Sequence, residues 1–140
     1  MIYLDTSVLV AALTREPATE RVQAWLTAQE GGELAISAWT HVEFAAALRF
    51  KAATGQIDER QRSTAGRGFT GLCETALVTW PVGPSDMEAA ALIASLDSLG
   101  LRGPDALHLA MARRRGVILC TLDQRLARGC EQLGHTSIAL

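Results

Sequence analysis

Five short apolar runs alternate with longer stretches of helical periodicity along this chain of 140 residues. The runs, which we predict to be strands, occupy residues 2–5, 34–37, 77–80, 117–121 and 137–140. The predicted helices occupy residues 7–14, 18–29, 40–53, 58–73, 86–96, 104–114 and 124–133. Strands that alternate with helices favour crossover connections and parallel pairing. We therefore expect an α/β fold, with a central, mainly parallel β-sheet of about five strands flanked by helices on both faces. The length predicts a single domain over residues 1–140.

Residues at the predicted helix ends support these boundaries. Thr40 with Glu43, and Ser85 with Glu88, have the spacing of a capping box. Pro104 suits the first turn of a helix, where its missing N–H is not needed. Glycines stand where four helices are expected to stop, at Gly55, Gly100, Gly116 and Gly134.

Four acids are each the only charged residue of an apolar stretch: Asp5, Glu43, Asp105 and Asp123. Their surroundings are MIYLDTSVLVAALT, LAISAWTHVEFAAAL, GPDALHLAMA and GVILCTLD, which contain no Lys or Arg. A carboxylate in an apolar interior costs several kcal/mol unless a cation or a proton compensates it. Asp5 and Asp123 follow predicted strands, and Glu43 lies in the first helical turn after another. Because parallel strands end at one edge of a sheet, these three should meet there, whereas the pattern does not place Asp105.

A simpler interpretation is that each acid ends or begins a helix, since carboxylates are favoured at helix N-termini. Asp5 and Asp123 could be N-caps, Glu43 part of a capping box and Asp105 a first-turn acid. A cap at a water-exposed helix end does not require apolar surroundings, however, and all four acids have them. We therefore keep capping as the alternative to a shared site.

Grouped carboxylates match the ligand preference of Mg²⁺ or Mn²⁺, which take oxygen ligands and retain several waters. One or two such ions can polarise a phosphodiester and activate a water for its hydrolysis. Thr6, Ser7 and Thr121 lie beside the acids and could hold a water or a phosphate oxygen. Four like charges should also raise the carboxyl pKa values without metal, and metal should stabilise the fold.

Composition excludes several other kinds of protein. The net charge of −2 favours no partner by itself, but outside the four isolated acids basic residues outnumber acidic ones. All basic residues except Lys51 are arginines, whose planar guanidinium suits phosphate. Three cysteines without a C-x-x-C spacing argue against a disulfide framework and a thiolate zinc site. The N-terminus has no signal-peptide pattern and no apolar run reaches the length of a membrane span, so we expect a cytoplasmic protein without membrane contact.

Two further motifs have weak functional meaning. Residues 66–71 match G-x-G-x-x-G, but they follow a polar helical stretch instead of a strand, which argues against a dinucleotide site. Asp105 and His108 share a helical face, as in half of a metal-binding helix. Because no second histidine is near, we expect His108 to be a packed or supporting residue.

Four blocks of the sequence resemble those of PIN-domain ribonucleases, and within them the VapC-type toxins of type II (VapBC) toxin–antitoxin systems. They are LDTSVLVAAL, ISAWTHVEFAAALR, LRGPDALHLAMA and LCTLDQRLARG, in that order. The resemblance implies a PIN-like fold and an Mg²⁺- or Mn²⁺-dependent endoribonuclease that cuts RNA with a metal-activated water. It also implies inhibition by a small VapB-like antitoxin and assembly as a homodimer.

The resemblance places Asp105 in the site together with the other three acids, as catalytic and metal-binding residues. The hydroxyl positions of the family match Thr6 or Ser7 and Thr121. The basic residues that we expect to contact the RNA backbone are Arg49, Lys51, Arg102 and Arg125. Two alternatives are a catalytically silent PIN-like module that binds a protein, and a metal-dependent phosphatase or DNA nuclease on the same fold.

Overall fold

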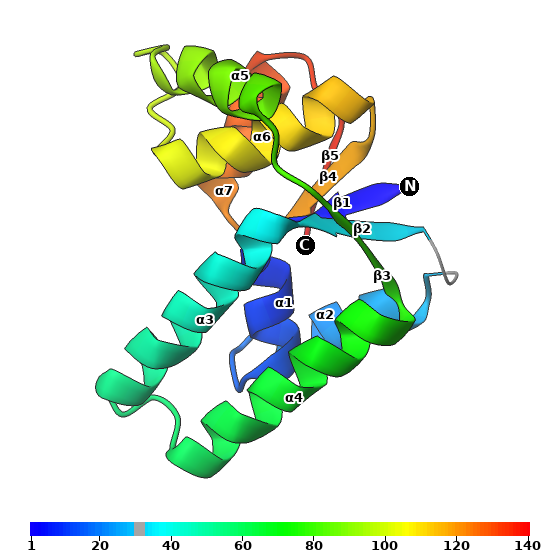
Figure 1. Cartoon of the computed structure of the whole chain (residues 1–140), viewed down its shortest axis with the longest axis vertical. Coiled ribbons are helices and arrows are strands. Elements are labelled where there is room, and N and C mark those ends of the chain that lie inside the picture. Colours follow the sequence, from blue (N-terminus) through cyan, green and yellow to red (C-terminus); the bar gives the residue numbers. More distant parts are fainter. Residues whose placement is uncertain (30–32) are drawn as a thin grey trace.

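The computed structural model describes residues 1–29 and 33–140, and these form a five-stranded sheet with helices on both faces (Figure 1). The strands are β1 (Ile2–Leu4), β2 (Leu34–Ser37), β3 (Leu77–Trp80), β4 (Ile118–Thr121) and β5 (Ser137–Ala139). The helices are α1 (Thr6–Leu13), α2 (Thr19–Thr27), α3 (Ala38–Ala53), α4 (Glu59–Thr75), α5 (Pro84–Ala94), α6 (Gly103–Arg115) and α7 (Gln124–Gln132). The strand order is β3-β2-β1-β4-β5 and every pair is parallel. The expected α/β class and sheet are confirmed.

The direction in which strands are added decides which face each helix covers. From β1 the chain adds β2 and β3 on one side, and α1 to α4 cover one face of the sheet (Figure 1). It then returns across the sheet to β4 and β5, and α5 to α7 cover the other face. The change of face follows because parallel crossover connections are right-handed. When the chain adds strands in the opposite direction along the sheet, a right-handed connection places its helix on the opposite face.

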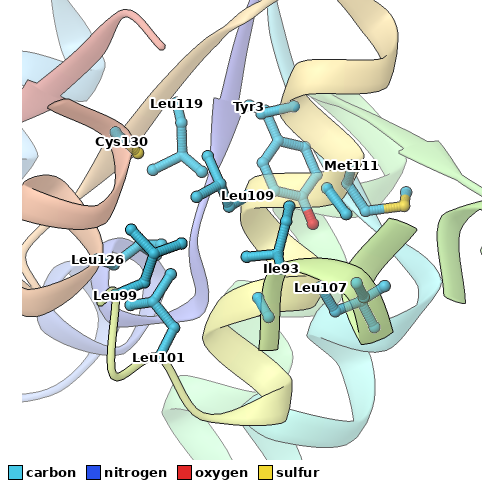
Figure 2. Close-up of a cluster of buried hydrophobic side chains, with 14 of the residues drawn as sticks. Tyr3, Ile93, Leu99, Leu101, Leu107, Leu109, Met111, Leu119, Leu126 and Cys130 are labelled. Carbon is cyan, nitrogen blue, oxygen red and sulfur yellow. The ribbon is translucent and has the colours of Figure 1, made fainter. Parts of the chain in front are cut away.

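Two hydrophobic cores result, one on each face of the sheet. Successive strand residues alternate between them, because side chains of a strand point to opposite faces. Tyr3 and Leu119 belong to the core under α5 to α7, whereas Leu4 and Cys120 belong to the core under α1 to α4. Figure 2 shows the first of these cores, with the ring of Tyr3 among the side chains of α6.

Helices α3 and α5 each begin two residues earlier than the sequence predicted. Helix α3 follows β2 without a loop, so its capping box is formed by Ser37 and Thr40, and Glu43 lies one turn further on. In α5, Gly83 and Asp86 form the capping contact in place of Ser85 and Glu88. The predicted pairs were wrong because an N-cap residue has an extended backbone and precedes the first turn. That residue is Ser37 in α3 and Gly83 in α5.

Most of the other boundary predictions are confirmed. Pro104 lies in the first turn of α6. Gly55, Gly116 and Gly134 stand at or directly after helix C-caps, and Gly116, at φ 63°, ends α6 in a left-handed conformation that other residues rarely adopt. The stop expected at Gly100 was wrong: this glycine also has a positive φ, but α5 ends earlier, at Ala94.

The motif at residues 66–71 lies in the middle of α4 instead of between a strand and a helix. Its glycines therefore form no phosphate-binding loop. Within residues 1–29 and 33–140, no helix combines the length and the apolar character required to span a bilayer.

Candidate active site

A cavity of about 450 Å³ opens beside the carboxyl ends of β1 and β4. Here the sheet changes its direction of winding, the position where open α/β sheets usually bind ligands. The cavity is lined by Asp5, Thr6, Ser7, Val10, Glu16, Glu43, Ala47, Asp105, Leu122 and Asp123. The structure thus brings together the four isolated acids, which come from four different parts of the chain.

Asp5 is the most firmly held of these acids. It follows β1, caps α1 and is only 7% exposed. Its Oδ2 accepts hydrogen bonds from the Ser7 hydroxyl at 2.6 Å and from the Thr121 hydroxyl at 2.5 Å, and its Oδ1 accepts from the Ser7 backbone N–H at 3.3 Å. Two of the predicted hydroxyl groups therefore fix this carboxylate.

Glu43 is paired with a histidine from the opposite face of the sheet. Its Oε2 accepts from the Thr6 hydroxyl at 2.6 Å and lies 2.6 Å from Nε2 of His108, which is 1% exposed. The other nitrogen of His108 lies 2.9 Å from the Tyr3 hydroxyl oxygen, whose proton is donated to Ser37. Because a carboxylate oxygen can only accept, Nε2 donates to Glu43, and this arrangement favours the protonated form of His108.

The pKa values of this pair agree with that assignment. Burial alone would raise the pKa of Glu43, but the hydrogen bond and charge of His108 and the bond from Thr6 outweigh it, so the pKa lies below its ordinary value. Burial would lower the pKa of His108, but the hydrogen bond to Glu43 and the charges of Asp5, Glu43 and Asp105 raise it above its ordinary value. The expectation of raised carboxyl pKa values is therefore wrong for Glu43, because His108 supplies a positive partner.

Asp105 and Asp123 lie at helix N-termini across the cavity. Burial raises the pKa of Asp105, and the nearby Asp123 adds to this effect, whereas Arg102 opposes it. The Arg102 contact is long, at 3.4 Å between Nε and Oδ2, and the Arg102 side chain is 71% exposed, so the pairing is weak. Asp123 caps α7 through Oδ1, which accepts from the backbone N–H groups of Arg125 and Leu126 at 2.7 and 3.2 Å.

Capping and a shared site thus coexist. Asp5 and Asp123 are N-caps, and Asp105 lies in a first turn, as the simpler interpretation proposed. Glu43 lies in the second turn of α3 and takes no part in its capping box. All four nevertheless line one cavity, because the helices that they cap or begin start at the same edge of the sheet.

The four basic candidates lie outside the cavity lining, in different settings. Lys51 is only 12% exposed and pairs with Glu16 at 2.6 Å, so its charge is already engaged. Arg102 pairs with Asp105, and Arg125 is exposed in the first turn of α7. Arg49 is exposed on α3, and no hydrogen bond or ion pair joins it to a lining residue within the described ranges. The structure groups the acids but does not gather these four cations around them.

Glu16 is a lining residue that the sequence analysis missed. It stands between Arg15 and Pro17, in a polar context that resembles an ordinary loop. The apolar surroundings that distinguish the other acids are absent, and only its contact with Lys51, 35 positions away, places it beside the cavity.

The chemistry of the lining suits a hard divalent cation, since it offers carboxylate and hydroxyl oxygens and no sulfur. Among residues 1–29 and 33–140, no three or more His, Cys, Asp or Glu side chains are arranged so that together they could hold a metal ion, so the protein offers no ready-made cage. Mg²⁺ needs no such cage, because it commonly binds through one or two carboxylates and keeps several waters. The residues therefore fit a partly hydrated ion.

Comparison with known proteins identifies the family to which this chain belongs. The PIN domain family model matches residues 2–131. The chain belongs to the PIN-domain family. Ribonuclease VapC47 of Mycobacterium tuberculosis is 33% identical over 142 residues, covering 98% of this chain and 95% of that protein.

Solved structures show the same PIN-domain fold. VapC20 of M. tuberculosis, described as a sarcin–ricin loop cleaving toxin, superposes with a TM-score of 0.73 at 16% identity, over 91% of this chain and 94% of that one. A chain of a toxin–antitoxin complex from Klebsiella pneumoniae has a TM-score of 0.63 at 19% identity, over 88% and 87%. These likenesses confirm the PIN-like fold that the four sequence blocks implied.

Proposed function

We propose that this PIN-domain protein is an Mg²⁺- or Mn²⁺-dependent endoribonuclease, and that residues 1–140 act as a single catalytic domain. The observation that carries the proposal is the meeting of four carboxylates in one cavity at the point where the sheet reverses its winding. Membership of the PIN-domain family and the likeness to Ribonuclease VapC47 support it.

In this proposal Glu43 and Asp123 each have one oxygen held by hydrogen bonds and one oxygen available to a ligand, whereas both oxygens of Asp5 already accept hydrogen bonds. Oδ1 of Asp123 caps α7 and Oε2 of Glu43 is held by Thr6 and His108. Within the described residues, Oδ2 of Asp123 and Oε1 of Glu43 have no hydrogen-bond partner. Asp5, Glu43 and Asp105 would hold the principal cation, in part through its bound waters, and Asp123 would reach it through water or complete a second site.

A bound divalent cation would polarise the scissile phosphate and lower the pKa of an attacking water. The protein's own part is to hold the oxygens that bind it. Ser7 and Thr121 prevent rotation of Asp5, and the buried sheet beneath excludes water from its anchored side. Because Lys51 is neutralised by Glu16, contact with the RNA backbone would fall mainly to Arg49, Arg102 and Arg125.

We also propose that the chain is the toxin of a toxin–antitoxin pair. The support is its likeness to Ribonuclease VapC47 and to the toxin–antitoxin complex from K. pneumoniae. A small VapB-like antitoxin would cover the acidic cavity with apolar and basic side chains and so silence it. The toxin would act in the cytoplasm, where it meets RNA, and would assemble as a homodimer.

The test is digestion of total RNA by the purified chain, freed of any co-purified partner, with Mn²⁺ or Mg²⁺ and with a chelator. Mapping of the new RNA ends should show discrete sites that appear only with metal. Single-stranded DNA and a small phosphate ester, offered in parallel, distinguish a ribonuclease from a DNA nuclease or phosphatase. Cleavage of either of these in preference to RNA would replace the proposed substrate.

Calorimetry distinguishes the proposed enzyme from the alternative, a catalytically silent module that binds a protein. If the four acids serve only as helix caps and lining, titration of the chain with Mn²⁺ should give no saturable heat. A saturable heat that the Asp5→Asn variant lacks is expected from the proposed enzyme.

A further inference from the structure

His108 contacts the site without lining the cavity. It lies one turn after Asp105 in α6, is almost fully buried, and meets Oε2 of Glu43 at 2.6 Å. It is the only buried histidine in the described ranges. The catalytic arrangement proposed above gives it no chemical step, so its burial beside a carboxylate needs another explanation.

Tyr3 holds the far side of the His108 ring. Tyr3 is fully buried, and its hydroxyl donates to Ser37 at 2.9 Å and lies in hydrogen-bond contact with Nδ1 of His108 at 2.9 Å. The Tyr3 hydroxyl is thus satisfied on both sides. With Nδ1 fixed in this way, the ring has one orientation, and its Nε2–H is directed at Glu43.

The Tyr3 ring is in turn held by an aromatic neighbour, Trp80. The two rings stack with a centroid separation of 5.7 Å and an interplanar angle of 6°. The guanidinium of Arg115 lies over the Trp80 ring at 5.0 Å and is held by Asp86 at 3.0 Å. Figure 2 shows the Tyr3 ring enclosed by Leu109 and Met111 as well. An unbroken series of contacts therefore leads from Asp86 to Glu43.

We propose that His108 is a positioning residue, which Tyr3 orients and which fixes Oε2 of Glu43 so that Oε1 is the oxygen given to the cation. The inference deepens the proposed function and rests on it. Oε2 already has two donors, His108 and Thr6, whereas Oε1 has no hydrogen bond within residues 1–29 and 33–140. The indole of Trp39 lies close enough to lower the pKa of Glu43, but its N–H does not reach hydrogen-bond geometry. Residues that orient a metal ligand in this way commonly change metal affinity or activity by about 10- to 100-fold when replaced.

Two other roles would give different results. If His108 only fills space in the core, a packed apolar replacement should leave Mn²⁺ binding unchanged. If it only balances the charge of the acids, its removal should strengthen Mn²⁺ binding, because a positive charge near the ion disappears. Of the three roles, only positioning predicts that Mn²⁺ binding weakens when the Nε2–H donor of His108 is lost and recovers when a neutral N–H donor replaces it.

The experiment compares His108→Leu, which removes the donor, with His108→Gln, whose amide N–H can replace Nε2–H. The full chain is titrated calorimetrically with Mn²⁺, and the Mn²⁺ concentration for half-maximal RNA cleavage is measured for each variant. We expect His108→Leu to weaken Mn²⁺ binding and to raise that concentration by about 10- to 100-fold. The His108→Gln variant should recover most of both.

Unchanged or tighter Mn²⁺ binding by a folded His108→Leu variant overturns the inference, as does a Gln variant no better than the Leu variant. Thermal unfolding in chelator establishes that each variant is folded. If His108→Leu does not fold, Tyr3→Phe, which removes only the hydroxyl behind Nδ1, must weaken Mn²⁺ binding, and unchanged binding again overturns it. Absence of Mn²⁺ binding by the unaltered chain would instead contradict the proposed function.

Discussion

Asp5 is the residue on which the proposed chemistry depends most directly. We expect Asp5→Asn to lower metal-dependent RNA cleavage by at least about 100-fold, since loss of a ligand should exceed loss of a residue that orients one. The Asn side chain can still meet the hydroxyls of Ser7 and Thr121, and one of four like charges is removed. Stability in chelator should therefore be unchanged or slightly higher.

Cleavage rates and thermal unfolding in chelator check this prediction. Asp97→Asn is the matched control, because Asp97 is exposed and lies outside the cavity lining. Full activity of Asp5→Asn, or an equal loss in Asp97→Asn, would show that Asp5 is not a ligand.

Asp86 gives a prediction about pH. Hydrogen bonding from Arg115, which outweighs the opposing effect of burial, lowers the pKa of Asp86 from 3.8 to about 2. A lowered pKa in the fold adds stability that is fully present above the ordinary pKa and is lost as the pH falls from about 4 towards about 2. Because Arg114 is half exposed and water screens its share, we expect a contribution of about 1–2 kcal/mol.

The Asp86→Asn variant should therefore lose about 1–2 kcal/mol of unfolding free energy at pH 7, and much less near pH 2, where about half of Asp86 is already protonated in the folded, unaltered chain. Denaturant unfolding at the two pH values measures the difference. An equal loss at both would mean that the variant acts through packing and not through charge.

At the scale of elements, two glycines of α4 differ in whether a neighbouring helix leaves room for a side chain. A Cβ at Gly66 would meet no atom within 4 Å, whereas a Cβ at Gly68 would lie 2.9 Å from Cδ2 of Leu13 in α1. Alanine favours a helix interior over glycine by about 1 kcal/mol. We expect Gly66→Ala to raise the unfolding free energy by up to about that amount.

Gly68→Ala should gain less, or lose stability, because Leu13 must move to admit the new methyl group. Denaturant unfolding of both variants provides the comparison, with each serving as the control for the other. A larger gain at Gly68 than at Gly66 would contradict the close approach of α1 and α4.

The elements themselves were largely predictable, and their ends less so. Alternation of apolar runs with helical patterns located all five strands, although only β1, β2 and β4 contain buried residues and the edge strands β3 and β5 are partly exposed. The starts of α3 and α5 were missed by two residues, because several polar residues could form the cap and only the backbone selects one. Asp105 was placed by the resemblance and not by the pattern, since a loop precedes it.

The contacts that orient the site were not predictable from the pattern. His108 and Tyr3 are 105 positions apart, and Glu16 and Lys51 are 35 apart. Their pairing depends on how β1, α3 and α6 pack, which local sequence does not encode. The apolar surroundings of Glu43 indicated a missing cation, but not that a histidine from the other side of the sheet would provide it.

For the whole molecule, metal binding should be coupled to folding. A ligand that binds only the native state adds about 2.7 kcal/mol of stability at about 100 times its dissociation constant. We expect Mn²⁺ at that level to raise the thermal midpoint, and chelator to reverse the rise. The Asp5→Asn variant should show little rise, and an equal rise in both proteins would place the binding elsewhere.

Strand order has a consequence for how the protein is made. β1, from the first residues, pairs with β4, which begins at Ile118, and the cavity needs Thr121 and Asp123 to be complete. A nascent chain that has not yet emerged beyond these residues holds Asp5 without its neighbouring strand. Partly translated or prematurely terminated copies therefore carry no finished site, and the cavity is completed only near the end of synthesis.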